Sequence, residues 1–153
     1  MPTYNLKLSK NFWLSEFTIS QTAQRLGIEN IPLPDHVDNL KLLCRHILQP
    51  LRDRMRRAIF ISSGYRSPAL NSFIGGSGTS DHRYGRAADI DSPTDNIKYF
   101  NFIKSNLIFD QLIWEFGNDE YPGWIHVSFR RGENRNQILK AYRDQHGIHY
   151  KEI

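Results

Sequence analysis

The stretch that decides the fold runs from Ser80 to Asp91 and reads S-D-H-R-Y-G-R-A-A-D-I-D. Within it, His82 and Asp89 stand seven positions apart, on either side of Gly85. Glycine accepts backbone conformations that other residues avoid, so the chain can turn back here and bring both side chains to one ion. The A-A-D-I-D run predicts a β-strand with its odd positions on one face, so Asp89 and Asp91 point the same way.

A third candidate ligand, His126, lies in the apolar run W-I-H-V-S at 124–128. Zinc in hydrolases takes three protein ligands from His, Asp, Glu or Cys and keeps one position open for water. His82, Asp89 and His126 supply that count. Alone, a histidine in an apolar strand is more often a core residue, and an aspartate near a turn is often a cap. Their combination favours a zinc site, with Asp91 as an alternative ligand or as a partner that orients one.

A zinc hydrolase also needs a general base, usually a carboxylate, and Glu115 is the candidate. Two strands are predicted, at 111–116 and 123–129, joined by the turn-rich segment G-N-D-E-Y-P. If Phe116 pairs with Gly123, Glu115 lies diagonally across from His126 on the same face. A register slip of one residue would break this assignment. Glu120 in the loop is the alternative base, and Glu115 could instead pair with an arginine.

The remaining pattern indicates helices around a sheet. Ser20 and Gly27 are typical of the two ends of a short helix, and Pro50 predicts a kink in a long amphipathic helix. Helices preceding and flanking a mostly antiparallel sheet give the α+β class, in a single domain over residues 1–153. The other predicted segments are the long helix at 34–55, a strand at 58–63, a helix at 69–73, a helix opening at Ser92-Pro93 and continuing to 107, and a terminal helix from Asn136 followed by extended residues.

Composition and charge narrow the class of protein. A chain of 153 residues, 39% of them hydrophobic, can bury a core without disulfides or a structural metal. The single Cys44 excludes an internal disulfide and a cysteine-rich zinc finger, and it is read as a small buried residue. The net charge of +4 favours anionic partners, although charge runs usually serve only as a solvated surface. No nucleic-acid-binding signature accompanies it, so a specific nucleic-acid partner is not expected.

The N-terminal residues, M-P-T-Y-N-L-K, lack the basic, apolar and small-residue regions of a secretory signal. No run of 18 apolar residues predicts a membrane span. We therefore expect a protein that is not exported by the Sec route. It would stay cytoplasmic until lysis of the cell releases it, or leave by a non-Sec route.

The spaced residues bear a family resemblance. The pattern Ser80-x-His82-x-x-Gly85-x-Ala87-x-Asp89, followed by Trp124-x-His126 and preceded by G-Y-R-S at 64–67, resembles the zinc D-Ala-D-Ala peptidases of the M15 type. The resemblance runs from about residue 59 to 129. It implies the fold shared with the hedgehog signalling domain. It also implies zinc bound by the histidines at 82 and 126 and the aspartate at 89, with Ser80 and Arg66 contacting substrate.

Such enzymes hydrolyse peptide bonds involving D-amino acids in bacterial peptidoglycan, as carboxypeptidases or as endolysin-type endopeptidases. The resemblance thus implies stem peptides as partners, and we expect a monomer. Without it, Ser80 could simply cap a turn, and Arg66 could be a surface ion-pair partner.

One departure from the family pattern concerns the base. Several members carry an acidic residue three positions before the last histidine, where this chain has Gly123. The position of Glu115 resembles that of a shorter, phage-associated branch. The departure keeps a second hypothesis open, a non-catalytic, metal-containing module that binds peptidoglycan or another partner.

Overall fold

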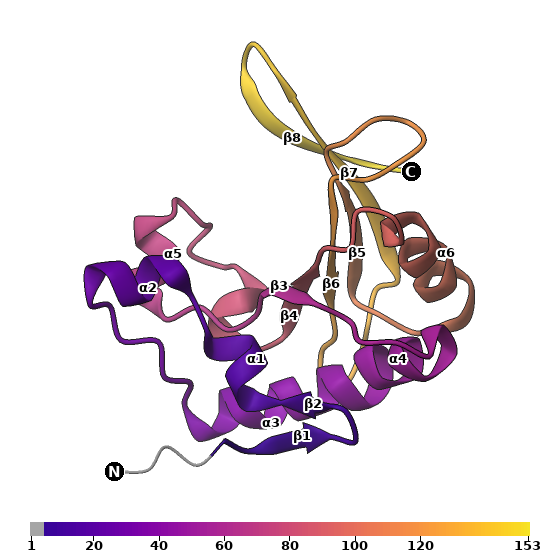
Figure 1. The fold of residues 1–153 in the computed structure, drawn as a ribbon. Helices are drawn as coiled ribbons and strands as arrows, with labels where there is room; N and C mark the ends of the chain where they lie inside the picture. The colour runs from indigo at the N-terminus through magenta and orange to yellow at the C-terminus, as the bar shows by residue number, and fades with distance from the viewer. Residues whose placement is uncertain (1–4) are drawn as a thin grey trace.

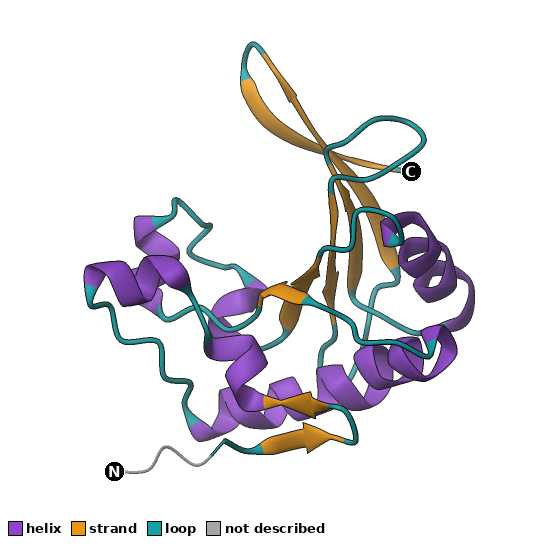
Figure 2. Ribbon diagram, in the orientation of Figure 1, coloured by secondary structure: helices purple, strands orange, loops and turns teal. Residues whose placement is uncertain are grey.

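The computed structural model describes residues 5–153 and is built around a six-stranded sheet (Figure 1, Figure 2). The strand order is β3-β4-β6-β5-β7-β8, and every neighbouring pair is antiparallel except β5 and β7, which are parallel. A separate two-stranded sheet pairs β1 with β2. The predicted α+β class is confirmed. The strands are β1 (Lys7–Ser9), β2 (Phe12–Trp13), β3 (Ile61–Ser63), β4 (Ala87–Ile90), β5 (Gln111–Glu115), β6 (Trp124–Ser128), β7 (Gln137–Asp144) and β8 (Gly147–Glu152).

The helical elements lie below and beside the sheet in Figure 1. The predicted long helix at 34–55 is present, but one turn of it, ahead of Pro50, is a π-helix. Proline has no N–H to donate to the carbonyl four residues back, and a π-turn accommodates that missing bond. The elements are α1 (Leu14–Thr18), α2 (Gln21–Leu26), α3 (Pro34–Leu43), the π-helix η1 (Cys44–Leu48), α4 (Gln49–Met55), α5 (Pro68–Phe73), the 3-10 helix η2 (Asp81–Tyr84) and α6 (Asn96–Asn106).

The two faces of the sheet differ in chemistry because side chains alternate along each strand. One face is apolar and packs on α3, η1, α4 and α6 to form the core. At its centre the ring of Phe100 in α6 meets that of Trp114 in β5 edge-on, with centroids 5.2 Å apart. The opposite face carries the polar residues. Buried core side chains from the strands are Ala88, Ile90, Leu112, Trp114, Ile125 and Val127, and those from the helices include Leu40, Leu43, Ile47, Leu51, Tyr99 and Ile103.

Several predicted boundaries differ from the structure. The tail from Asn136 was expected to begin with a helix and instead forms the hairpin of β7 and β8. The helix expected to open at Ser92 begins only at Asn96, because the Ser92 carbonyl accepts bonds from the N–H groups of Asp95 and Asn96 and closes a turn first. The helix bounded by Ser20 and Gly27 is confirmed. Within residues 5–153, no helix is long and apolar enough to cross a membrane.

Candidate metal centre

Two of the three predicted ligands face each other across neighbouring strands. Asp89 of β4 pairs with His126 of β6 in the antiparallel register. His82 reaches them from η2, which ends at Gly85 with a positive φ of 69°. A Cβ at this glycine would lie 2.3 Å from the carbonyl oxygen of His36, so the turn leaves room for no other residue. The turn predicted at Gly85 is therefore confirmed.

The ligand atoms of these three side chains lie within 4.8 Å of one another and form a possible metal site among the described residues. One carboxylate oxygen, Oδ1 of Asp89, is 3.2 Å from Nε2 of His82 and 3.1 Å from Nδ1 of His126. The two imidazole centroids are 5.1 Å apart. Two nitrogens and one oxygen form a donor set that suits zinc.

The orientation of His82 supports a metal ligand. Its Nδ1 lies 2.7 Å from the carbonyl oxygen of Gly64, so this nitrogen carries the proton and donates it. Nε2 then carries the lone pair that can bind a metal, and this atom is buried without a hydrogen-bond partner. A buried polar atom without a partner is costly, and a metal ion would satisfy it. The residues present therefore fit zinc.

Burial and charge act on the pKa values of the three ligands in different directions. Burial lowers the pKa of His82, and the charge of Asp89 offsets this only in part. Burial opposes ionisation of Asp89, but His82 and His126 together hold its pKa far below its ordinary value. Burial also disfavours the charged form of His126, yet its bond to Asp89 raises its pKa. An ionised carboxylate and a neutral His82 are thus ready to bind a cation, while the raised pKa of His126 makes a proton compete with the metal at this ligand.

The predicted hairpin register is confirmed. Glu115 pairs with Trp124 and Ile113 with His126, so Glu115 lies diagonally across from His126. Only 7% of Glu115 is exposed, and burial is the main reason that its pKa rises to about 7. Glu120, the alternative base, is exposed in the loop and is not among the residues that line the cleft. Geometry therefore favours Glu115.

Arg66 and Ser80 also lie at the site. The backbone N–H of Arg66 donates to the carbonyl of His82, and its guanidinium Nε is buried without a partner. The hydroxyl of Ser80 accepts from the N–H of His82 and caps η2, so both its expected capping role and its position at the cleft are observed. Asp91 is not part of this cluster of ligands, and its carboxylate accepts a hydrogen bond from Asn96.

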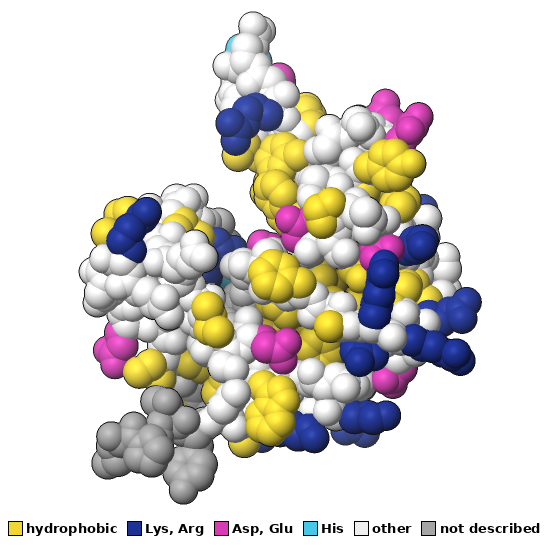
Figure 3. All heavy atoms as spheres, in the orientation of Figure 1, with side chains coloured by type: hydrophobic (Ala, Val, Ile, Leu, Met, Phe, Trp, Pro, Cys, Tyr) yellow, Lys and Arg dark blue, Asp and Glu magenta, His cyan; other side chains and the backbone are white. Residues whose placement is uncertain are grey.

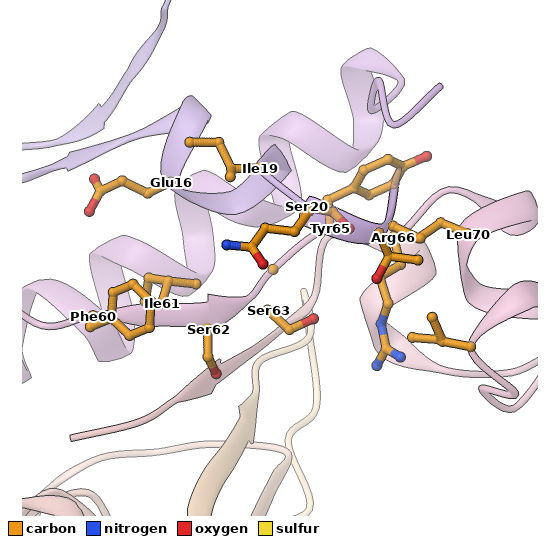
Figure 4. A pocket seen from close by; sticks show the side chains of 14 residues that line it. Glu16, Ile19, Ser20, Phe60, Ile61, Ser62, Ser63, Tyr65, Arg66 and Leu70 are labelled. Atoms are coloured by element: carbon orange, nitrogen blue, oxygen red, sulfur yellow. The ribbon is translucent and has the colours of Figure 1, made fainter. Parts of the chain in front are cut away.

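A cleft of about 820 Å³ lies on the polar face of the sheet, and it is lined by Arg66, Ser80, His82, Asp89, Glu115 and His126. In Figure 3 the surface is hollowed between the lobe of α2 and α5 and the projecting β7–β8 hairpin. A second cavity, of about 630 Å³, lies between β3 and the helices α1 and α2 (Figure 4). The two cavities share Arg66 and Ile74, so they adjoin at these two residues.

Comparison with known sequences identifies the family. A sequence model of Peptidase M15 matches residues 10–128, more than three quarters of the chain. The chain belongs to the Peptidase M15 family. No curated protein matches it by sequence. Membership in this M15 family makes the chain a metallopeptidase of a zinc-dependent kind, and the cluster of His82, Asp89 and His126 could hold the metal.

Sequence reasoning missed some residues of this M15 cleft. Tyr150 and Arg143 of the C-terminal hairpin line it, and they were overlooked because the segment from Asn136 was expected to begin with a helix. Asp81, which the sequence predicts to be structural or cleft-lining, is buried, lines the cleft and pairs with Arg86 and Arg130. The alternation of apolar and polar residues in I-H-Y-K, at 148–151, could have indicated the last strand.

Proposed function

We propose that this M15 protein is a zinc peptidase that hydrolyses D-amino-acid-containing peptide bonds of peptidoglycan, as a carboxypeptidase or an endolysin-type endopeptidase. One observation carries the proposal. Three ligand atoms gather within 4.8 Å, and a buried carboxylate, Glu115, lies diagonally across from one of them in the same cleft. A purely structural zinc site is closed by four ligands and needs no carboxylate beside it.

The roles of the residues follow from their positions. His82, Asp89 and His126 would hold the zinc ion, which as a Lewis acid polarises a carbonyl and makes water more acidic. Glu115 accepts the proton of the attacking water and passes it to the leaving amine. A pKa near 7 suits both transfers, because the group gains and loses a proton at neutral pH.

Two further residues would bind the substrate. The guanidinium of Arg66 has an unpartnered Nε in the cleft and can donate to a peptide carbonyl or a terminal carboxylate. The hydroxyl of Ser80 accepts a bond from its own helix, which leaves its O–H free to donate to a substrate oxygen.

The test is mass analysis of purified muropeptides after incubation with zinc-loaded protein. We expect fragments whose masses identify the cleaved bond, and no fragments after chelation. A His126→Ala variant should be inactive. His149→Ala is the matched control, because this histidine pairs with Asp144 on the exposed hairpin and does not line the cleft. Full activity of His126→Ala would refute the metal assignment.

A second function, a non-catalytic module that binds cell-wall fragments, is favoured by Gly123, where several family members carry an acid. Here Gly123 lies against the Glu115 carbonyl, to which its N–H donates, so no side chain from this position can act as base. Zinc-loaded protein that binds muropeptides without cleaving any would support the module.

A further inference from the structure

The C-terminal hairpin extends the cleft face of the sheet beyond the metal ligands. In the strand register, Glu115 pairs with Ala141 of β7, and Ala141 pairs with Tyr150 of β8. These three residues therefore form one row on the same face. The side chain between the other two is only a methyl group, so the phenol of Tyr150 can lie over it, toward Glu115.

Arg143 lies on the same face, in the row next to that of Glu115, Ala141 and Tyr150 and further than it from the metal ligands. Arg143 is two positions after Ala141 in the strand, so their Cα atoms are roughly 7 Å apart. It pairs with Ile148, and both line the cleft. The guanidinium carbon of Arg143 lies 5.9 Å from the centroid of the Phe116 ring, which in turn packs on Trp124 at 5.3 Å. An aromatic shelf thus supports this cation and leaves its N–H groups free.

Of the other cleft arginines, Arg66 also has no ion pair among the described residues, but it lies beside the metal ligands, and the remaining two are paired with carboxylates. Arg130 pairs with Asp81 and Asp110, and Arg135 pairs with Asp110. No ion pair or hydrogen bond engages the Arg143 side chain within the described part of the chain, residues 5–153. The outer end of the cleft therefore presents an uncompensated positive charge beside an apolar surface.

We propose that Arg143 is a specificity-determining residue that binds a carboxylate of the peptide substrate, with the Phe116 ring holding the guanidinium in place. The proposal rests on the proposed peptidase function and names the substrate class, a peptide with a carboxylate about two residues from the scissile bond. The hairpin lies outside residues 10–128, so the family match does not include Arg143. A guanidinium fork and a carboxylate form paired hydrogen bonds that a carboxamide cannot match.

Three synthetic stem peptides test the proposal, namely L-Ala-γ-D-Glu-L-Lys-D-Ala-D-Ala, the same peptide with the D-glutamyl α-carboxylate as carboxamide, and the same peptide with an amidated C-terminus. Binding is measured by calorimetry on zinc-loaded protein that carries Glu115→Gln to prevent turnover. One of the two amidations should weaken binding about ten-fold, and which one does so identifies the carboxylate. Adding Arg143→Gln should remove that difference.

The matched control is Lys151→Ala, which removes a positive charge from the same hairpin but on the opposite face, over Tyr142. It should leave the ten-fold difference intact. Equal binding of the three peptides, binding of none, or a difference that survives Arg143→Gln would overturn the proposal. Mass analysis of the peptides after titration separates it from the peptidase function, because cleavage by the Glu115→Gln protein counts against the base and not against Arg143.

Discussion

At the scale of the residue, the environment of Glu115 disfavours its ionised form in the metal-free protein. Its carboxyl group is buried close to the negative charge of Asp89, and both factors disfavour the ionised form. His126 and Arg66 favour ionisation but do not compensate fully, so the pKa is about 7. The environment that suits Glu115 to proton transfer therefore lowers the free energy of unfolding of the protein.

A pH dependence follows. The folded protein keeps the Glu115 proton up to a pKa of about 7, against an ordinary value of 4.5, so the free energy of unfolding falls as pH rises between these values. In metal-free protein, Glu115→Gln should be stabilising by on the order of 3 kcal/mol above pH 7 and neutral below pH 4.5. Urea unfolding of chelated samples at pH 4, 6 and 8 measures this.

The same substitution should reduce turnover of the zinc-loaded protein by about 10² to 10⁴. Glu120→Gln is the control, since this exposed side chain has no such environment and should change neither quantity. If Glu120→Gln lost activity and Glu115→Gln kept it, Glu120 in the loop would be the catalytic base.

The metal ligands and the candidate base could be predicted from the sequence because their spacing is recognisable. His82, Asp89 and His126 stood in a fixed pattern, and Glu115 followed from the register that a short turn imposes. The carbonyl of Gly64 that orients His82 was not predictable, because backbone carbonyls carry no sequence signal and this contact joins segments 18 residues apart.

At the scale of the element, the segment between β6 and β7 is fixed by a buried carboxylate. Asp110, fully buried just before β5, accepts hydrogen bonds from the guanidinium of Arg135 at 2.7 and 3.0 Å and forms an ion pair with Nε of Arg130 at 3.1 Å. These bonds tie residues 130–135 to the start of β5. They thereby set the position of β7, which runs parallel to β5.

Asp110→Asn should therefore lower the free energy of unfolding by about 2 kcal/mol, because it removes the charge that two half-exposed guanidinium groups share. Asp119→Asn is the control. Its side chain is 98% exposed and pairs with Lys140, so unfolding should change little. Equal unfolding midpoints of both variants in urea would show that the Asp110 contacts do not position β7.

The elements differed in how far sequence could predict them. The helix at 34–55 was predicted because its apolar residues recur at helical spacing, and the hairpin of β5 and β6 because a turn-rich loop separates two apolar runs. The parallel pairing of β5 with β7 was not predicted. It joins segments 26 residues apart through a loop whose position depends on ion pairs with Asp110, and periodicity does not report such contacts.

At the scale of the whole molecule, the metal ligands lie on one face of the sheet and the core on the other. We expect the chelated protein to remain folded in one cooperative unit, since the core does not include the ligands. Zinc at a thousand times its Kd should add about 4 kcal/mol, a rise in Tm of roughly 10 °C. Calorimetric melting with and without chelator measures this.

His126→Ala should show no rise in Tm on adding zinc, while His149→Ala should behave as the parent protein. Circular dichroism showing an unfolded chelated protein at 25 °C would contradict the separation of core and site. The α+β class and the family pattern were predictable at this scale because binary patterning and spaced motifs report them directly.

The bond from His82 to the carbonyl of Gly64 has an evolutionary consequence. An orienting partner that is a side chain can be lost by a single codon change, but a peptide carbonyl is present whatever residue is encoded. Substitution at Gly64 is limited instead by space, because an added Cβ would lie 2.6 Å from the backbone of Phe17. The orientation of His82 therefore tolerates amino-acid substitutions at most neighbouring positions. That of His126 depends instead on the side chain of Asp89.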